Sequence, residues 1–203
     1  MKKKIIIFDF NGVIVSSIQL CYRLNQKDIP DLEYSEWQSW FEGNFYKSIR
    51  PELSGEDYQL PFFEKYNRGV VEILPVEGIK KVIEDLAQKF TLTIISSGTR
   101  KAIEQYLKKY DLSSFFEEIL AREIHHGKVE KIHMILDRYK VEPTDTLMVT
   151  DTVGDIKEAH IAGIKSLGVI WGVHDQEKLT EVSPHFIATN PDEIIAGVKQ
   201  ILK

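Results

Sequence analysis

The stretch from Lys4 to Ser16, KIIIFDFNGVIVS, limits the possible folds of this chain more than any other stretch. Four apolar residues lead directly into Asp9, and a second apolar run follows Asn11 and Gly12. A short, unbroken apolar run that ends at a glycine turn predicts a strand buried on both faces. Asp9 would then lie at the carboxyl end of that strand, where open parallel sheets bind their ligands. On this stretch alone, Asp9 suits a capping role in the turn as well as it suits chemistry.

Beyond residue 75 the apolar pattern alternates between strand and helix. The expected strands are 91–95, 118–121, 146–150, 166–170 and 186–188, and the expected helices are 79–90, 100–110, 129–139, 156–162 and 191–202. Strands that alternate with helices of this length indicate β-α-β units. The sequence therefore predicts an α/β fold with a doubly wound parallel sheet.

Residues 15–74 have a different composition, with 11 aromatic residues and without the alternation of apolar and polar residues that is typical of strands. Apolar residues recur at helical spacing, as in Trp37, Trp40 and Phe41. We therefore expect an inserted α-helical cap domain with a small aromatic core, in which most of these rings serve packing. The predicted division is a core domain of residues 1–14 and 75–203 and a cap domain of residues 15–74.

Composition narrows the class of partner and the cellular location. The net charge of -5 and the pI of about 5.7 provide no basic field for nucleic acid or for an anionic membrane. No apolar run is long enough for a signal peptide or a membrane span. Cys21 is the only cysteine, which excludes an internal disulfide. We expect a cytoplasmic protein, and no feature of the sequence specifies an oligomeric state.

Polar side chains lie at or near the ends of several predicted elements. They are Asp9 with Asn11, Ser96 with Ser97, Lys128, and Asp151 with Asp155. Because parallel strands place their carboxyl ends at one edge of the sheet, these groups should converge. Carboxylates so close together require a cation, and Mg²⁺ binds a few carboxylates together with phosphate oxygens. A carboxylate that attacks phosphorus forms an aspartyl-phosphate.

Four motifs in the same order resemble those of the haloacid dehalogenase (HAD) superfamily, closest to its phosphatase and phosphomutase branch. The family pattern hhhhDxDGxh resembles IIIFDFNGVIV, and its strand ending in Ser or Thr resembles TIISSG. A lysine that opens a helix is found in GKVEKIHMIL, and hhGDxxxDhxxAxxAG resembles MVTDTVGDIKEAHIAG. The motifs span residues 5–163, and the family inserts its α-helical cap where residues 15–74 lie. The resemblance implies a Rossmann-like core and a hydrolase.

The resemblance also implies a metal site. Asp9 would be the nucleophile and a Mg²⁺ ligand, and Asn11 would offer its backbone carbonyl to the metal. Asp151 would be a further ligand, and Asp155 a ligand or an acceptor behind the ligands. The alternative for Asp151 and Asp155 is capping of a helix N-terminus, a role that is also expected of Thr152.

On the phosphate side, the resemblance implies that Ser96 and Lys128 hold the phosphoryl oxygens. Ser97 and Gly98 would shape the turn that binds the substrate. Lys128 would also offset the negative charge around Asp9. A solvated lysine at a helix start remains the alternative for Lys128, with Lys131 as a nearby competitor.

Asn11 departs from the family pattern, in which the second acid of the first motif protonates the leaving oxygen and later activates water. An amide neither delivers nor accepts a proton at neutral pH, and general acid–base catalysis contributes about 10² to 10⁴ in rate. We therefore expect slow hydrolysis unless another group replaces the acid. Lys47 is one candidate, although a plain surface lysine is favoured. Two further explanations are deamidation of the Asn11–Gly12 pair to Asp and an Asn introduced to trap an inactive form.

Three functions follow from these observations. The first is a Mg²⁺-dependent HAD-type hydrolase that acts on a small phosphorylated metabolite. The second is a catalytically impaired HAD-fold module with a binding or regulatory role. The third, a phospho-acceptor receiver domain, is disfavoured by the insertion over residues 15–74. His125, His126 and His133 do not match a zinc-ligand spacing, and Trp171–Gly172 is interpreted as structural.

Overall fold

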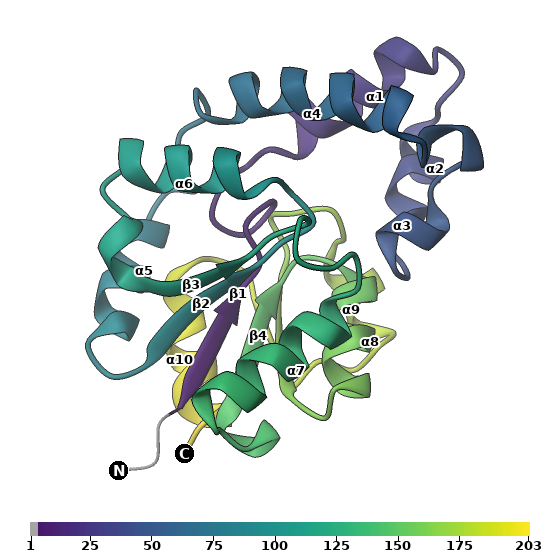
Figure 1. The fold of residues 1–203 in the computed structure, drawn as a ribbon. Coiled ribbons are helices and arrows are strands. Elements are labelled where there is room, and N and C mark those ends of the chain that lie inside the picture. The colour runs from purple at the N-terminus through teal and green to yellow at the C-terminus, as the bar shows by residue number, and fades with distance from the viewer. Residues whose placement is uncertain (1–3) are drawn as a thin grey trace.

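The computed structural model describes residues 4–203 and is built around a six-stranded, fully parallel sheet (Figure 1). The strand order is β3-β2-β1-β4-β5-β6, so the winding reverses beside β1, where doubly wound sheets bind ligands. The strands are β1 (Ile5–Phe8), β2 (Thr91–Ile95), β3 (Phe116–Leu120), β4 (Thr146–Thr150), β5 (Lys165–Val169) and β6 (Phe186–Ala188). The predicted α/β fold with a doubly wound sheet is confirmed.

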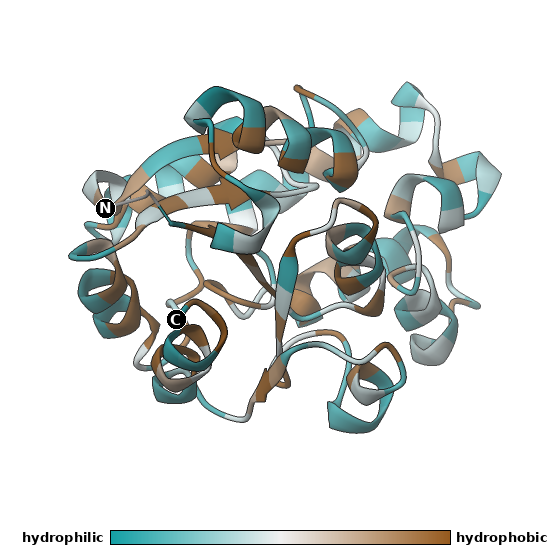
Figure 2. Cartoon of the chain, turned by 90° about the horizontal axis from the view of Figure 1, so that it is seen from below, coloured by the Kyte–Doolittle hydropathy of each residue, from teal (hydrophilic) through white to brown (hydrophobic). Residues whose placement is uncertain are grey.

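Helices cover both faces of the sheet because both faces are apolar. In β1, Ile6 and Phe8 pack into one hydrophobic cluster, while Ile5 and Ile7 pack into another on the opposite face. The first face is covered by α5 (Ile79–Ala87), α6 (Arg100–Lys109) and α10 (Asp192–Ile201), and the second by α7 (Lys128–Tyr139) and α8 (Val153–Ile161). Figure 2 shows that brown, apolar segments of these helices turn toward the sheet and that teal, polar segments turn outward.

The aromatic insertion forms a helical cap beyond the carboxyl ends of the strands (Figure 1). Its helices are α1 (Ile18–Asp28), α2 (Tyr34–Ser39), α3 (Phe45–Ser48) and α4 (Glu56–Val70), with a 3₁₀ turn over Pro51–Leu53. Trp37 and Trp40 lie in a separate cap cluster with Leu32 and Leu53, so most of the expected aromatic core exists. The far end of α4 differs, because Phe63 and Tyr66 join the main core instead.

Two linkers join the cap to the core and lie side by side. Val15 forms an isolated antiparallel bridge with Pro75, and the Val76 N–H donates to the Ile14 carbonyl at 3.0 Å. These backbone hydrogen bonds therefore hold the two linkers together at the base of the cap. The domain boundaries at residues 14/15 and 74/75 remain our proposal, and these paired linkers are consistent with them.

Several predicted element ends need correction. The helix expected over 156–162 begins three residues earlier, because the Thr152 hydroxyl accepts the Asp155 N–H (3.2 Å) and so caps the helix as expected. The helix expected over 79–90 ends at Ala87, where the chain turns to enter β2. Helix α9 (Gln176–Thr180) was not expected, since five residues are too few to show a helical period. The remaining elements are 3₁₀ turns over Ser113–Phe115 and Pro143–Asp145.

No helix within residues 4–203 combines the length and the apolar character that crossing a bilayer requires.

Candidate functional site

The register of the central strands brings three predicted site residues to one level. Phe8 in β1 is opposite Ile94 in β2 and Val149 in β4. Asp9, Ser96 and Asp151 therefore leave their strands within two residues of each other in register. The sequence predicts that parallel strands bring their carboxyl ends to one edge, and in the structure this edge faces the cap (Figure 1).

Asp9 is buried at this edge and is held by two donors. Its Oδ1 accepts the Phe10 N–H at 2.6 Å, and its Oδ2 accepts from Lys128 Nζ at 2.8 Å. Lys128 is the first residue of α7 and is only 3% exposed, which excludes the solvated alternative for this lysine. A charged ammonium in such a place persists only because carboxylates surround it.

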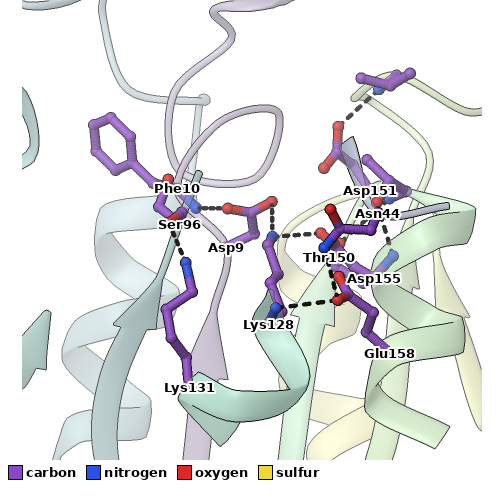
Figure 3. A network of polar contacts seen from close by, with 12 residues as sticks. Asp9, Phe10, Asn44, Ser96, Lys128, Lys131, Thr150, Asp151, Asp155 and Glu158 are labelled. Atoms are coloured by element: carbon purple, nitrogen blue, oxygen red, sulfur yellow. Dashed lines mark hydrogen bonds and ion pairs between the residues drawn. The ribbon is translucent and has the colours of Figure 1, made fainter. Parts of the chain in front are cut away.

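Lys128 links Asp9 to Asp155 (Figure 3). Its Nζ donates to Asp155 Oδ2 at 2.6 Å, and the Thr150 hydroxyl donates to the same oxygen at 2.7 Å. At the start of α7, the Lys128 N–H donates to Glu158 Oε1 at 3.1 Å. Both the backbone and the side chain of Lys128 are therefore positioned by acids of α8.

Asp151 follows β4 and is almost fully buried. Its Oδ2 accepts the Val173 N–H at 2.8 Å, whereas its Oδ1 has no hydrogen-bond partner among the described residues. Gly12 and Gly172 make room for this carboxylate, since a Cβ at either position would overlap it. Gly172, interpreted from the sequence as structural, thus shapes the site directly.

The charges of the three carboxylates are only partly balanced. Burial and the charge of Asp155 raise the pKa of Asp9 to about 7, although Lys128 lowers it. Burial and the charge of Asp9 also raise the pKa of Asp151 well above its usual value. For Asp155 burial acts in the same direction, but the charge and hydrogen bond of Lys128 prevail and lower the pKa. Lys128 therefore balances the negative charge of Asp155, but it does not balance the charges of both Asp9 and Asp151.

This imbalance suits a divalent cation. Within residues 4–203 no three His, Cys, Asp or Glu side chains are grouped as a metal site, and Lys128 Nζ lies between Asp9 and Asp155. The orphaned Asp151 Oδ1 nevertheless has the chemistry of a Mg²⁺ ligand, and Asp9 lies close enough to raise the pKa of Asp151. The residues present therefore fit Mg²⁺ at Asp9 and Asp151, with Asp155 engaged by Lys128 and Thr150.

The Asn11 side chain has a defined orientation. Its Oδ1 accepts a hydrogen bond from the Ser17 hydroxyl (2.9 Å) and another from the Tyr66 hydroxyl of α4. Its Nδ2 is turned toward the turn after β2, where a Cβ built on Gly98 would lie 3.5 Å from it. The amide thus presents its donor to the site and its acceptor to the cap.

The turn after β2 contains Ser96, Ser97 and Gly98, and the structure gives the predicted site residues of this turn different surroundings. Ser96 is fully buried, and its hydroxyl accepts the Gly98 N–H at 3.0 Å. Ser97 borders the cavity that contains Asp9 and Lys128. Lys131, the expected competitor of Lys128, donates instead to the Ser96 carbonyl at 2.7 Å, and burial lowers its pKa to about 8. Lys131 therefore supports this turn from below and does not contact Asp9.

A cavity of about 590 Å³, partly open to solvent, surrounds these groups and is called the acidic cavity here. Its charged lining consists of Asp9, Lys128, Asp151, Asp155 and Glu158. His126 also lines it and stacks on Tyr46, with ring centroids 4.0 Å apart. The sequence alone suggested no role for His126, although its position two residues before Lys128 is a signal that it lies near the site. Lys47 is exposed and does not line the acidic cavity.

A family model described as haloacid dehalogenase-like hydrolase matches residues 6–169. Among similar proteins, one named phosphoglycolate phosphatase, of Synechococcus elongatus, is 24% identical, and the match covers 98% of each chain. The pyrophosphatase PpaX of Bacillus pumilus is 25% identical, with 95% of each chain covered. These similarities include the cap as well as the core, since they extend over nearly the whole chain.

Solved structures share the fold. A haloacid dehalogenase-like family protein of Streptococcus pneumoniae superposes with a TM-score of 0.79 at 21% identity, covering 96% of this chain and 98% of that one. A hydrolase of Pseudomonas syringae gives a TM-score of 0.81 at 16% identity, covering 99% of this chain and all of the other. At this level of identity the likeness concerns the fold alone.

Proposed function

The chain belongs to the haloacid dehalogenase-like hydrolase family, and we propose that it is a Mg²⁺-dependent phosphatase acting on a small phosphorylated metabolite through an aspartyl-phosphate on Asp9. One observation carries the proposal: Lys128 Nζ joins Asp9 and Asp155, while Asp151 Oδ1 beside them is buried without a partner among the described residues. The relatives named as phosphatases support the same reaction class.

Asp9 performs the first step. A carboxylate oxygen of Asp9 forms a bond to phosphorus as the bond between phosphorus and the leaving oxygen breaks, and the leaving oxygen takes a proton from solvent water because Asn11 has none to give. The Phe10 N–H and Lys128 Nζ hold the Asp9 carboxylate in place and reduce its freedom before attack. In the second step water attacks phosphorus, the bond to Asp9 breaks, and phosphate leaves with Asp9 restored.

Mg²⁺ would be held by Asp9 and Asp151, with Asp155 and the backbone carbonyl of Asn11 as the further contacts that the family motifs imply. When bound, the cation supplies positive charge to the phosphoryl oxygens and to the nucleophile. Lys128 supplies a second positive charge at a fixed place. The resemblance implied a phosphoryl contact for Ser96, but Ser96 is fully buried and its hydroxyl accepts the Gly98 N–H. The proposal therefore gives this contact to Ser97, which borders the acidic cavity.

Proton transfer is assigned to His126 because Asn11 cannot perform it. His126 lines the acidic cavity, and burial together with Arg122 lowers its pKa below the usual value. An unprotonated imidazole at this position can accept the proton of the water that attacks the aspartyl-phosphate. Asn11 Nδ2, which faces the turn after β2, donates a hydrogen bond to the substrate but moves no proton.

The test is phosphate release from a panel of phosphomonoesters, with Mg²⁺ and with EDTA. We expect slow, Mg²⁺-dependent release by the wild type and none by Asp9→Asn. Asn11→Asp should raise kcat by about 10² or more, because it restores a general acid–base group. A folded, Mg²⁺-binding Asn11→Asp variant that releases no phosphate from any ester would contradict the proposed function.

The amide at position 11 favours one second candidate, a binding module without turnover. Hydrogen bonds from Ser17 and Tyr66 to Asn11 Oδ1 accommodate Asn without conflict. This alternative predicts that non-hydrolysable phosphonates raise the Tm while no phosphomonoester is cleaved.

A further inference from the structure

A second cavity lies inside the cap and is distinct in character from the acidic cavity. The space that its lining residues border is about 600 Å³, including solvent at the opening, and it is called the aromatic cavity here. Rings and aliphatic chains dominate its lining, among them Trp40, Phe62, Phe63, Ile49 and Leu53. No lysine, arginine, aspartate or glutamate of the described residues lines it.

The two cavities adjoin. They share six lining residues, which are Asn11, Cys21, Trp37, Phe41, Phe45 and Ser97. Asn11 lies at this junction, two residues after the nucleophile Asp9. A phosphoryl group beside Asp9 and Lys128 would therefore have its leaving group directed past Asn11 into the aromatic cavity.

The polar side chains of the aromatic cavity are largely occupied by the protein. Asn25 donates to the Cys21 carbonyl (2.8 Å) and accepts from the Tyr58 hydroxyl (2.8 Å). Gln59 donates to the Leu53 carbonyl at 2.7 Å. Burial raises the pKa of the Cys21 thiol to about 12, so this group stays neutral. The lining consequently offers apolar contact rather than charge recognition.

We propose that the substrate is a phosphomonoester of an aromatic or otherwise apolar alcohol, whose ring occupies the aromatic cavity. This inference rests on the proposed phosphatase function and specifies its substrate class. Apolar surface gains free energy on entering such a cavity, whereas a carboxylate there would be buried without a cation.

Because no cationic side chain within residues 4–203 lines the aromatic cavity, we do not expect this chain to prefer carboxylated esters such as phosphoglycolate. Arg122 is the cation to consider, but its guanidinium stacks on the Phe63 ring at 4.0 Å and is not part of the cavity lining. Arg122 also donates to Gln59 Oε1 at 3.4 Å. The guanidinium is therefore held against Phe63 and Gln59, outside the lining of the aromatic cavity.

Benzyl phosphate, ethyl phosphate and phosphoglycolate provide the first comparison, with phosphate release measured in the wild type and in Asn11→Asp. Benzyl and ethyl esters have leaving alcohols of similar acidity, so a difference in kcat/KM reports the cavity rather than the chemistry. We expect kcat/KM for benzyl phosphate to exceed the other two by about tenfold or more, from burial of the ring. Equal values, or a preference for phosphoglycolate, would overturn the inference and leave the phosphatase function intact.

Phosphonates provide a readout that does not need turnover. Calorimetric Kd values for phenethylphosphonate, propylphosphonate and phosphonopropionate should show the same preference, with the phenethyl compound about tenfold tighter or more. If the preference is present and no ester is cleaved by either protein, the proposed reaction fails and the apolar ligand class stands. If propylphosphonate or phosphonopropionate binds as tightly as the phenethyl compound, the ligand class is wrong.

Two variants locate the ring. Phe62→Lys places a cation in the aromatic cavity and should reverse the order, so that phosphonopropionate binds better than phenethylphosphonate. Leu60→Lys is the matched control, because Leu60 is on the same helix, is 64% exposed and does not line the cavity. Ile49→Trp, which fills the cavity from another element, should abolish the phenethyl preference. A preference unchanged in folded Phe62→Lys and Ile49→Trp would show that the ring binds elsewhere.

Discussion

At the scale of the residue, the Asn11 amide lies two residues after Asp9, the proposed nucleophile, and its hydrogen bonds connect this turn to the cap. Ser17 and Tyr66 both donate to Oδ1, which leaves Nδ2 on the side of the turn after β2. The same region bears on deamidation, because the attacking Gly12 N–H is already bonded to the Val15 carbonyl at 2.9 Å. The structure thus supports Asn11 as a hydrogen-bond donor and leaves proton transfer to another side chain.

His126 is the residue that should replace the missing acid–base group. His126→Gln is expected to lower kcat of the wild type by about 10² or more, since water would then lack a proton acceptor. The same substitution in an Asn11→Asp background should have little effect, because the introduced aspartate would act instead. His133→Gln, which changes an exposed histidine on α7, is the control. Equal losses in both backgrounds would assign His126 a packing role beside Tyr46.

Gly172 should control the metal affinity through Asp151. A Cβ at this position would overlap the Asp151 carboxylate, and the next residue, Val173, binds Asp151 Oδ2. We expect Gly172→Ala to weaken Mg²⁺ binding about 10- to 100-fold in calorimetry, the usual cost of disturbing the support of a ligand. Gly55→Ala, where no atom lies within 4 Å of the new Cβ, should leave the affinity unchanged. An unchanged Kd in folded Gly172→Ala would remove Asp151 from the ligand set.

At the scale of the element, the ends of helices hold the site together. Helix α7 begins at Lys128 and α8 begins just before Asp155, so each helix start carries a site residue. Thr150, the last residue of β4, binds Asp155 Oδ2 and connects the strand to the helix. A shift in either helix start would therefore separate Lys128 from its two acids.

Removing the N-terminal caps of two helices tests whether a change in kcat arises from positioning of the site or from a general loss of stability. Thr152 caps α8 by accepting the Asp155 N–H at 3.2 Å, and Thr99 caps α6 by accepting the Ala102 N–H at 3.3 Å. Thr152→Val and Thr99→Val should each lower the free energy of unfolding by about 1 kcal/mol in urea titrations. Thr152→Val should lower kcat more than Thr99→Val does, because it releases the helix turn that carries Asp155, whereas the Thr99 hydroxyl binds Asn67 of α4 at 2.8 Å. Similar kcat losses in the two variants would mean that the α8 cap has no special part in positioning.

At the scale of the whole molecule, the core holds the charged groups and the cap holds the apolar cavity. The last turns of α4 bridge the two, since Phe63 and Tyr66 belong to the main hydrophobic cluster while Phe63 also lines the aromatic cavity. Paired linkers at Val15 and Pro75 anchor the base of the cap. The substrate would therefore be enclosed by both parts of the chain, with its phosphoryl group in the core.

The Tm of the protein should depend on the unbalanced negative charge of Asp151. Because burial and Asp9 raise the pKa of Asp151, the ionised carboxylate opposes folding at neutral pH when no cation is present. Asp151→Asn should thus raise the Tm in EDTA, and it should abolish the further rise that Mg²⁺ produces in the wild type. Calorimetric scans with EDTA and with Mg²⁺ check both effects. An Asp151→Asn variant that still gains stability from Mg²⁺ would place the cation elsewhere.

Local sequence was sufficient to predict a parallel sheet, the helical character of residues 15–74 and the meeting of Asp9, Lys128 and Asp155. Apolar periodicity is a property of neighbouring residues, and parallel strands necessarily bring their carboxyl ends to one edge. Other contacts depend on segments far apart in the sequence or on the path of a loop, as in the packing of Gly172 on Asp151 and the hydrogen bond from Tyr66 to Asn11. These contacts arise from the strand order and from the docking of the cap, which no local pattern encodes. The aromatic rings of the insertion were visible in the sequence, but their closure around a cavity beside Asn11 follows from tertiary packing.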